Sequence, residues 1–151
     1  MTSSLQALVA EALETGRIKN LPSRHFINGA WVESQSGDML ETLDPGTGDV
    51  ITAVAAGGEA EIQAAVAAAE QAQRGIWRST PPAERAAILL RATRIMRQRA
   101  EPLAVVESLD SGKTLAEAQG DVAGSARCFE YYAGLADKLH GDTIPRGQDH
   151  L

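Results

Sequence analysis

The sequence has few aromatic residues and almost no cysteine. Aromatic residues make up 4% of the 151 positions, so we expect the helices to pack closely through Ala, Leu, Ile and Val, with few large rings to anchor a core. The one cysteine, Cys128, excludes an internal disulfide and a cysteine-rich zinc site. A reducing compartment, the cytoplasm, is therefore the expected location.

An excess of positive charge is also absent. The chain carries 14 basic and 20 acidic side chains, which gives a net charge of -6 and an isoelectric point near 5.0. Nucleic-acid binding depends on basic surface, so no nucleic-acid partner is expected. The N-terminus lacks the basic segment of a signal peptide, and Glu11 and Glu14 interrupt its apolar residues. We therefore expect neither a secretory signal nor a membrane partner.

What is present is a mostly helical pattern in a chain long enough for one domain or a piece of a larger one. Apolar residues at three- and four-residue steps predict helices over 4–15, 59–74, 81–99, 102–109 and 115–136. Gly16 and Gly112 are expected to end two of them in the left-handed conformation. Thr80 and Pro81 are predicted as the N-cap and first residue of the third helix. Its apolar stripe is predicted to contain Ile88, Ala92, Ile95 and Met96.

Short strands complete the pattern. Asn28-Gly29 between apolar residues predicts a β-hairpin, because both residues tolerate the positive φ of a type I′ turn. Residues 40–43 and 50–54 read as strands on either side of a turn at 44–48. None is the continuous Val/Ile-rich run of a buried parallel strand. The apolar stripes of the helices therefore need a partner that these strands do not provide.

Two glycine-containing segments invite a phosphate-binding interpretation. Ser111-Gly112-Lys113-Thr114 resembles the end of a P-loop, but Glu107 stands where the leading glycine is required, and a predicted helix precedes it. We interpret it as the end of one helix and the start of the next. Gly57-Gly58 lacks the spacing of a dinucleotide loop and is interpreted as a strand-to-helix turn, with Glu59 and Glu61 in the first helical turn.

Single reactive residues have simple structural interpretations. Cys128 has no nearby histidine, so a buried structural cysteine is favoured over a nucleophile. Asp110 and Asp121 are typical of helix caps, although a loop aspartate can also bind a hard cation. Arg85 and Lys138 are expected in surface salt bridges. His25, His140 and His150 are too dispersed for a zinc site. These residues by themselves indicate no reaction.

The order of several local motifs carries a family resemblance. They are Phe26-Ile27-Asn28-Gly29-Ala30-Trp31, Asp44-Pro45-Gly46-Thr47-Gly48-Asp49-Val50-Ile51, Trp77 with Arg85, Leu109-Asp110-Ser111-Gly112-Lys113, Tyr131-Tyr132-Ala133-Gly134 with Ala136-Asp137-Lys138, and Gly141 with Thr143-Ile144-Pro145. From about residue 25 to 146 the chain resembles the N-terminal part of the NAD(P)-dependent aldehyde dehydrogenase superfamily, closest to its betaine-aldehyde and general aldehyde branches. Asp44, Asp49 and Thr114 depart from the usual family residues but keep the chemistry of a turn or a cap.

This resemblance implies an enzyme that oxidises a small aldehyde to a carboxylic acid and passes a hydride to NAD or NADP. The family's catalytic cysteine, glutamate base, oxyanion asparagine and cofactor loop have no counterpart within residues 1–151. We therefore expect no catalytic and no cofactor-binding residue here, and no cofactor bound by this chain alone. Either the chain is an N-terminal piece that is inactive alone, or it is a non-catalytic interaction module that docks on a full-length relative or another partner.

The resemblance also implies a fold and a domain organisation. We expect an α/β fold: the N-terminal part of an aldehyde dehydrogenase cofactor-binding domain, mostly helical with peripheral β-hairpins, and with most of the parallel-sheet core missing. Residues 1–24 would be a helical extension, 25–140 the partial cofactor domain, and 141–151 the start of a truncated oligomerisation hairpin. A homo-oligomer, or self-association, is the expected assembly.

Two sites carry over from the family by position. The carbonyl of Leu43 and the carboxylate of Asp110 match residues that hold a structural monovalent cation in many relatives. Asp121, Gly124 and Ser125 match a helix beside the substrate tunnel, where small side chains would widen the entrance.

Overall fold

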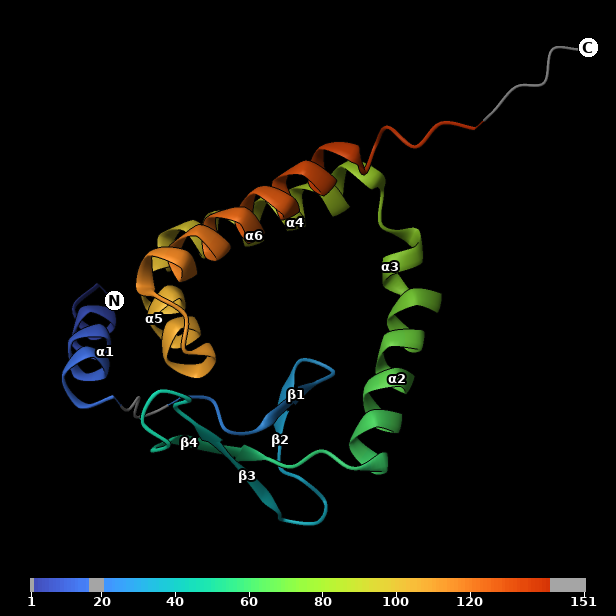
Figure 1. The fold of residues 1–151 in the computed structure, drawn as a ribbon. Helices are drawn as coiled ribbons and strands as arrows, with labels where there is room; N and C mark the ends of the chain where they lie inside the picture. Colours follow the sequence, from blue (N-terminus) through green and yellow to red (C-terminus); the bar gives the residue numbers. More distant parts are fainter. Residues whose placement is uncertain (1, 17–20, 142–151) are drawn as a thin grey trace, which may run out of the picture.

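The chain follows an open ring in the computed structural model, which describes residues 2–16 and 21–141 (Figure 1). Two hairpins form one side of the ring, α2 and α3 the next, α4 and α6 run together along the third, and α5 with α1 closes toward the hairpins. The elements are α1 (Thr2–Thr15), β1 (His25–Ile27), β2 (Ala30–Val32), β3 (Met39–Leu43), β4 (Val50–Ala55), α2 (Glu59–Arg74), α3 (Ile76–Ser79), α4 (Pro82–Gln98), α5 (Ala100–Ser111) and α6 (Leu115–Leu135).

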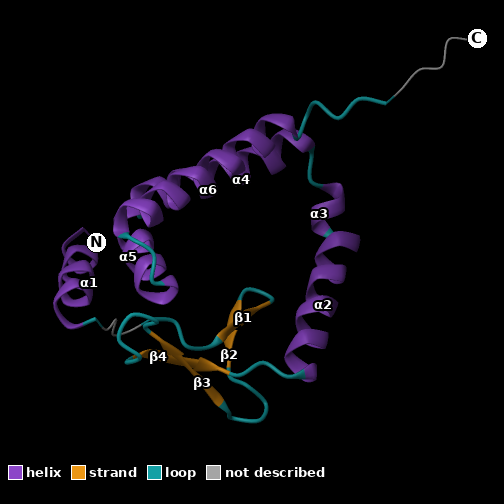
Figure 2. Ribbon diagram, in the orientation of Figure 1, coloured by secondary structure: helices purple, strands orange, loops and turns teal. Residues whose placement is uncertain are grey.

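The strands in the described residues form two separate antiparallel pairs, β1 with β2 and β3 with β4 (Figure 2). This confirms the predicted fold class: a mostly helical N-terminal portion with peripheral hairpins, in which no parallel sheet occurs among the residues described. None of the described helices combines the length and the apolar character needed to cross a membrane.

The β1–β2 hairpin turns where the sequence predicts it. Asn28 and Gly29 have φ values of 51° and 76°, the positive values that a type I′ turn requires. Phe26 and Trp31 face each other across the pair with ring centroids 5.0 Å apart. Both rings are exposed, at 63% and 46%. The hairpin is therefore set by its turn and not by burial of its aromatic residues.

Asp44, which departs from the residue usual in the family, stabilises the β3–β4 turn. Its carboxylate accepts a hydrogen bond of 2.7 Å from the amide of Gly46, and its carbonyl accepts one from the amide of Gly48. This is the local bonding by which Asp and Asn both stabilise turns. From β4, Ile51 and Ala55 are buried, whereas Met39, Leu40 and Leu43 of β3 are exposed.

The start of α4 differs from the prediction. Pro81 is the N-cap, at φ -58° and ψ 147°, and the helix begins at Pro82. The physical reason is the second proline, which disfavours helical geometry in the residue before it. Thr80 instead follows the short helix α3, which the sequence did not predict, and its hydroxyl donates to the carbonyl of Ile76, the first residue of that helix.

Arg85 corrects a second expectation. Its guanidinium donates from Nε to the carbonyl of Thr80 (2.9 Å) and from Nη2 to that of Arg78 (3.3 Å), and it lies 5.4 Å from the centre of the Trp77 ring. It forms no ion pair within the described residues, so the predicted surface salt bridge is wrong. Arg85 holds the α3–α4 junction. Lys138 does form the predicted surface pair, with Asp137 at 2.7 Å.

The packed part of the chain is the helical side of the ring. Val9 and Ala12 of α1 pack with Val105 of α5, and the seam of α6 is made of Ala118, Ala126 and Ala133, all at most 2% exposed. On α4 the buried residue is Thr93, at 2%, while Ile88 and Ile95 of the predicted stripe are 40% and 44% exposed. This exposure agrees with the expectation that the apolar stripes of the helices need a partner that the strands do not provide.

Cys128 is exposed, so the expected buried cysteine is also wrong. The helical period gives the reason: Cys128 lies two residues beyond the buried Ala126, which places it about 200° around α6 from the seam.

Much apolar surface stays uncovered. Among the large apolar side chains, Ile62 and Val66 of α2 are 63% and 55% exposed, and Ile76 of α3 is 79% exposed. All residues of α2 and α3 are described, and none of them is buried. The expectation that the helices carry apolar faces without a partner in this chain thus agrees with the structure.

Candidate functional site

A hollow of about 520 Å³ lies beside α6. Its lining includes Asp121, Gly124 and Ser125, the three residues that the family resemblance places at the substrate tunnel. The structure therefore brings all three to one surface. The sequence analysis missed the rest of the lining, which comes from α4, α5 and α6: Met96, Leu103, Glu107, Gly120 and Val122.

Lys113 ties two carboxylates of this hollow together. Its Nζ lies 2.6 Å from Oε1 of Glu107 on α5 and 2.8 Å from Oδ2 of Asp121 on α6. The hydrogen bonds that Lys113 donates to Asp121 and, to a smaller extent, to Glu107 raise the pKa of Lys113 above its ordinary value, so the ammonium stays charged. The charge of Lys113 offsets only one of the two carboxylates, so this wall of the hollow keeps a net negative charge. Asp121 is therefore held by an ion pair, and the expectation of a helix cap is wrong for it.

The connection between α5 and α6 places Lys113. Gly112 ends α5 at φ 71°, and Thr114 caps α6: its Oγ1 accepts from the amide of Glu117 (3.3 Å), and the Glu117 carboxylate accepts from the amide of Thr114 (3.1 Å). The Ser108 hydroxyl donates to the carbonyl of Lys113 at 2.8 Å. This confirms the prediction that Ser111 to Thr114 ends one helix and starts another. Because α5 precedes it, the segment has no P-loop geometry.

The two residues of the predicted cation site lie in neighbouring segments. Leu43 ends β3, and Asp110 is exposed in the last turn of α5. A Cβ built on Gly112 would lie 2.7 Å from Cγ of Pro45, so the turn after β3 touches the residues that follow α5. A carbonyl and a carboxylate are donors that suit a hard cation. Among the described residues no cluster of three or more His, Cys, Asp or Glu side chains could hold a metal.

The strand-to-helix turn at Gly57-Gly58 does not fit a dinucleotide. The carboxylate of Glu61 accepts from the amides of Gly58 and Gln35, each at 2.7 Å, and so occupies the N-terminus of α2. These hydrogen bonds, that from Gln35 foremost, lower the pKa of Glu61 and keep it charged. A pyrophosphate would meet this negative charge. The structure confirms the interpretation of this segment as a turn.

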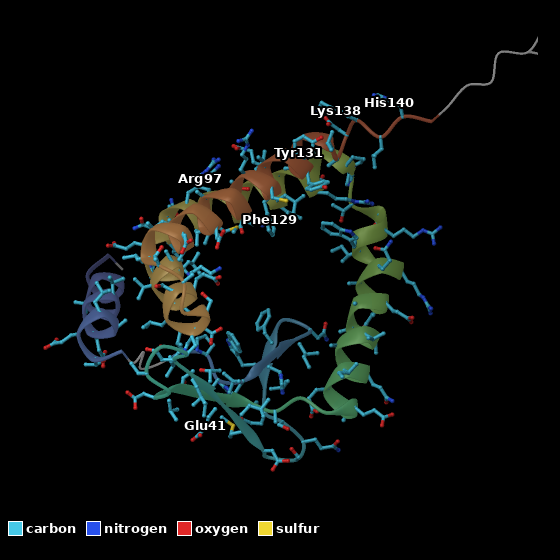
Figure 3. The ribbon with its side chains drawn as sticks, viewed as in Figure 1. Glu41, Arg97, Phe129, Tyr131, Lys138 and His140 are labelled. Atoms are coloured by element: carbon cyan, nitrogen blue, oxygen red, sulfur yellow. The ribbon has the colours of Figure 1, made fainter. Side chains whose placement is uncertain are left out.

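A bidentate ion pair links α4 to α6, and its Arg97 directly follows Met96, which lines the hollow. Arg97 donates to both carboxylate oxygens of Glu130, at 3.1 and 2.7 Å, on the outer side of the ring (Figure 3). The hydrogen bonds from Arg97 and its positive charge lower the pKa of Glu130. Sequence spacing could not predict this pair, because the two residues come from different helices.

The pKa of Glu130 should report this link. We expect carboxyl-carbon NMR titration to give a pKa below the ordinary 4.5, and the substitution Arg97→Gln to raise it toward that value. Because the pKa of Glu130 is lower in the folded chain than in the unfolded chain, the ion pair stabilises the folded chain at pH values above the unfolded-state pKa. This stabilisation is lost as the pH falls through the folded-state pKa. Arg91→Gln, an exposed change on the same helix, should leave the titration unchanged. An identical pKa in the Arg97→Gln and unaltered chains would contradict the assignment.

Comparison with known proteins identifies the family. The model of the Aldehyde dehydrogenase family matches residues 31–151, which is most of the chain. The chain therefore belongs to the aldehyde dehydrogenase family, and it corresponds to the N-terminal segment of the family's members.

Individual relatives support the same family assignment. An aldehyde dehydrogenase of Aspergillus niger is 40% identical over 126 residues, covering 83% of this chain and 25% of the relative. The betaine aldehyde dehydrogenase of Rhizobium etli is 42% identical over 127 residues, covering 83% and 26%. A solved putative aldehyde dehydrogenase from Burkholderia cenocepacia superimposes with a TM-score of 0.80 at 40% identity, covering 83% and 26%. PnpE, solved in complex with nicotinamide adenine dinucleotide, gives 0.79 at 34% identity, covering 85% and 26%. The chain spans about a quarter of the length of the curated relatives it matches.

Proposed function

We propose that this chain supplies the N-terminal outer part of an NAD(P)-dependent enzyme that oxidises a small aldehyde to a carboxylic acid. The observation that carries the proposal is the family match over residues 31–151, together with a backbone arrangement shared with a solved relative at a TM-score of 0.80. NAD or NADP, bound by parts of the fold outside this chain, would accept the hydride from the aldehyde. PnpE, a relative solved with NAD, supports this cofactor class.

The chain's own contribution is a wall of the substrate path. Asp121, Gly124 and Ser125 would line the tunnel, and the Lys113 ammonium would hold the Asp121 carboxylate in a fixed position. Gly124 has no atom within 4 Å of the place where a Cβ would lie, so it leaves room for an entering molecule. An acidic wall would also favour approach of a neutral or cationic aldehyde over an anionic one.

The remaining features of the proposal rest on the family and on composition. The Leu43 carbonyl and Asp110 would hold a structural monovalent cation together with a donor outside this chain. Residues 1–24 would be an extension and 25–140 the partial cofactor domain. The hairpin of 141–151, which would join a homo-oligomer, lies outside the described residues except for Gly141. A cytoplasmic location is inferred from the single cysteine.

A joined chimera tests the proposed function. It carries residues 1–151 of this chain followed by the part of the Rhizobium etli betaine aldehyde dehydrogenase that lies beyond the aligned region. We expect purified chimera to oxidise betaine aldehyde with NAD, whereas the 151-residue chain alone should show no such activity. A folded chimera without NAD-dependent oxidation, or an active isolated chain, would contradict the proposal.

The tunnel assignment has its own test in the joined chimera. Gly124→Leu should lower kcat/KM for the aldehyde by about tenfold or more, because a side chain added in the tunnel weakens binding in the transition state by roughly 1.4 kcal/mol or more. The KM for NAD should not change. Gly134→Ala, which adds a side chain elsewhere on α6 where nothing lies within 4 Å, is the matched control. Equal aldehyde kinetics in the two variants would show that Gly124 does not line the tunnel.

A further inference from the structure

Two hollows adjoin on the surface where α4 meets α6. One, of about 430 Å³, is lined by Arg94 and Gln98 together with the Arg97–Glu130 ion pair, and we name it the Arg94 hollow. The other, of about 390 Å³, is lined by Arg127 and the same ion pair, and we name it the Arg127 hollow. Because both linings include Arg97 and Glu130, the two hollows meet at this pair, on the outer side of the ring (Figure 3).

The charge of this surface is opposite in sign to that of the whole chain. Three arginines and one glutamate line the two hollows, which leaves two positive charges in excess, whereas the chain has a net charge of -6. Guanidinium groups stay protonated throughout the physiological pH range. The surface therefore attracts anions locally, although the chain as a whole repels them.

Two of the three arginines have donors to spare. Arg97 donates to both oxygens of Glu130, so this carboxylate is already paired. The side chains of Arg94 and Arg127 are exposed, and neither forms a hydrogen bond or ion pair with any residue that the structure describes. Arg94 and Arg97 are three residues apart, so they lie on the same face of α4. Their planar N–H groups match the oxygens of a phosphate group.

The lining of the Arg127 hollow indicates that the ligand also has an organic part. Small apolar side chains line this hollow beside Arg127: Ala100, Val122, Ala123 and Ala126. The volumes of both hollows lie in the lower part of the range for small-molecule sites, about 300–1,000 Å³. A phosphate group thus suits the donors of the Arg94 hollow, and a compact apolar group suits the neighbouring one.

We propose that the two hollows together bind a small organic phosphate monoester. Its phosphate group lies between Arg94 and Arg97, and its organic part extends past the Arg97–Glu130 pair into the Arg127 hollow. Such a ligand contacts both α4 and α6 and braces the two helices against each other. The site includes none of the residues assigned to the substrate tunnel or the cation, so the proposal goes beyond the proposed function and does not depend on it.

Isothermal titration calorimetry at constant ionic strength tests the site, because salt screens exposed charges. Phenyl phosphate, the probe, is titrated into the joined chimera and into the 151-residue chain, and we expect saturable 1:1 binding to the chimera. Arg94→Gln with Arg127→Gln should weaken binding at least about tenfold, because charge-assisted hydrogen bonds to the phosphate are lost. Arg74→Gln with Arg78→Gln removes the same charge outside both hollows and should leave the affinity unchanged.

Further probes separate the possible ligands. Inorganic phosphate lacks the organic part and should bind at least about threefold more weakly than phenyl phosphate, because it leaves the apolar lining uncovered. Equal or tighter binding of inorganic phosphate would overturn the ester, and tighter binding of hexaglutamate would assign the surface to an acidic polypeptide instead.

Two results would overturn the site itself. One is the absence of saturable phenyl phosphate binding to either protein, and the other is equal affinity in the two double variants. No part of this test measures aldehyde oxidation, so its failure leaves the proposed function standing, and an inactive chimera that binds phenyl phosphate would contradict only the proposed function.

Discussion

Purified alone, the 151-residue chain is expected to melt over a broad temperature range or to self-associate, without a sharp two-state transition. Nine apolar residues are buried in the described part, and six of them are alanines, whose side chains bury little surface. Ordering the backbone costs about 1–2 kcal/mol per residue, so burial on this scale cannot be expected to stabilise a chain of this length. Each Leu or Ile left exposed forgoes roughly 1.5–3 kcal/mol of burial.

Calorimetry and near-ultraviolet circular dichroism check this result. We expect helical far-ultraviolet signal with weak near-ultraviolet signal, as in molten states, and a broad or absent heat-capacity peak. Size-exclusion chromatography at several concentrations distinguishes loose monomers from self-association. A sharp peak at monomeric concentration, with equal calorimetric and van't Hoff enthalpies, would show that the chain has a sufficient core of its own and would contradict the prediction.

The substitution Gly112→Val should be among the most destabilising single changes, measured in the joined chimera, where the apolar faces are covered. Gly112 has φ 71°, and a Cβ there would lie 2.7 Å from Cγ of Pro45, a closer approach than real Cβ atoms make. Left-handed geometry costs a branched residue about 1–3 kcal/mol, and forced overlap with a rigid ring about 1–3 kcal/mol more. The change would separate the turn after β3 from the start of α6 and shift Lys113.

Thermal inactivation of the chimera measures the effect. We expect a lower midpoint for Gly112→Val and reduced aldehyde oxidation. Gly134→Ala is the matched control: it lies inside α6 with nothing within 4 Å of its Cβ position, so it should be neutral or stabilise the helix by about 0.5–1 kcal/mol. Equal midpoints for the two variants would show that the contact between Gly112 and Pro45 does not join the segments.

Local signals in the sequence predicted the elements well. The bounds of α2, the turn at Asn28-Gly29 and the left-handed glycines Gly16 and Gly112 all agree with the structure. Each depends on residues within a few positions, such as helical spacing or a glycine that tolerates positive φ. The family resemblance, confirmed over residues 31–151, supplied the fold class that these local signals could not.

Contacts between elements were not predictable in the same way. Thr93 is buried while Ile88 and Ile95 are exposed, although α4 packs against α6, whose buried residues are alanines. The lining of the hollow beside α6 was likewise not predictable from local sequence signals. Lys113 joins Glu107 and Asp121 from two helices, and no spacing in the sequence relates these three residues. The family resemblance placed Asp121, Gly124 and Ser125 beside the tunnel but did not predict that Lys113 and Glu107 lie next to Asp121.

Hydrogen exchange over residues 59–74 tests most directly whether the exposed faces of this chain are interior surfaces of a larger fold. In the isolated chain, the amides of α2 should exchange almost as fast as in an unfolded peptide, since none of its residues is buried. In the joined chimera the same amides should exchange at least about a hundredfold more slowly, because the rest of the fold covers Ile62 and Val66. Equal exchange of α2 in the two proteins would contradict this account.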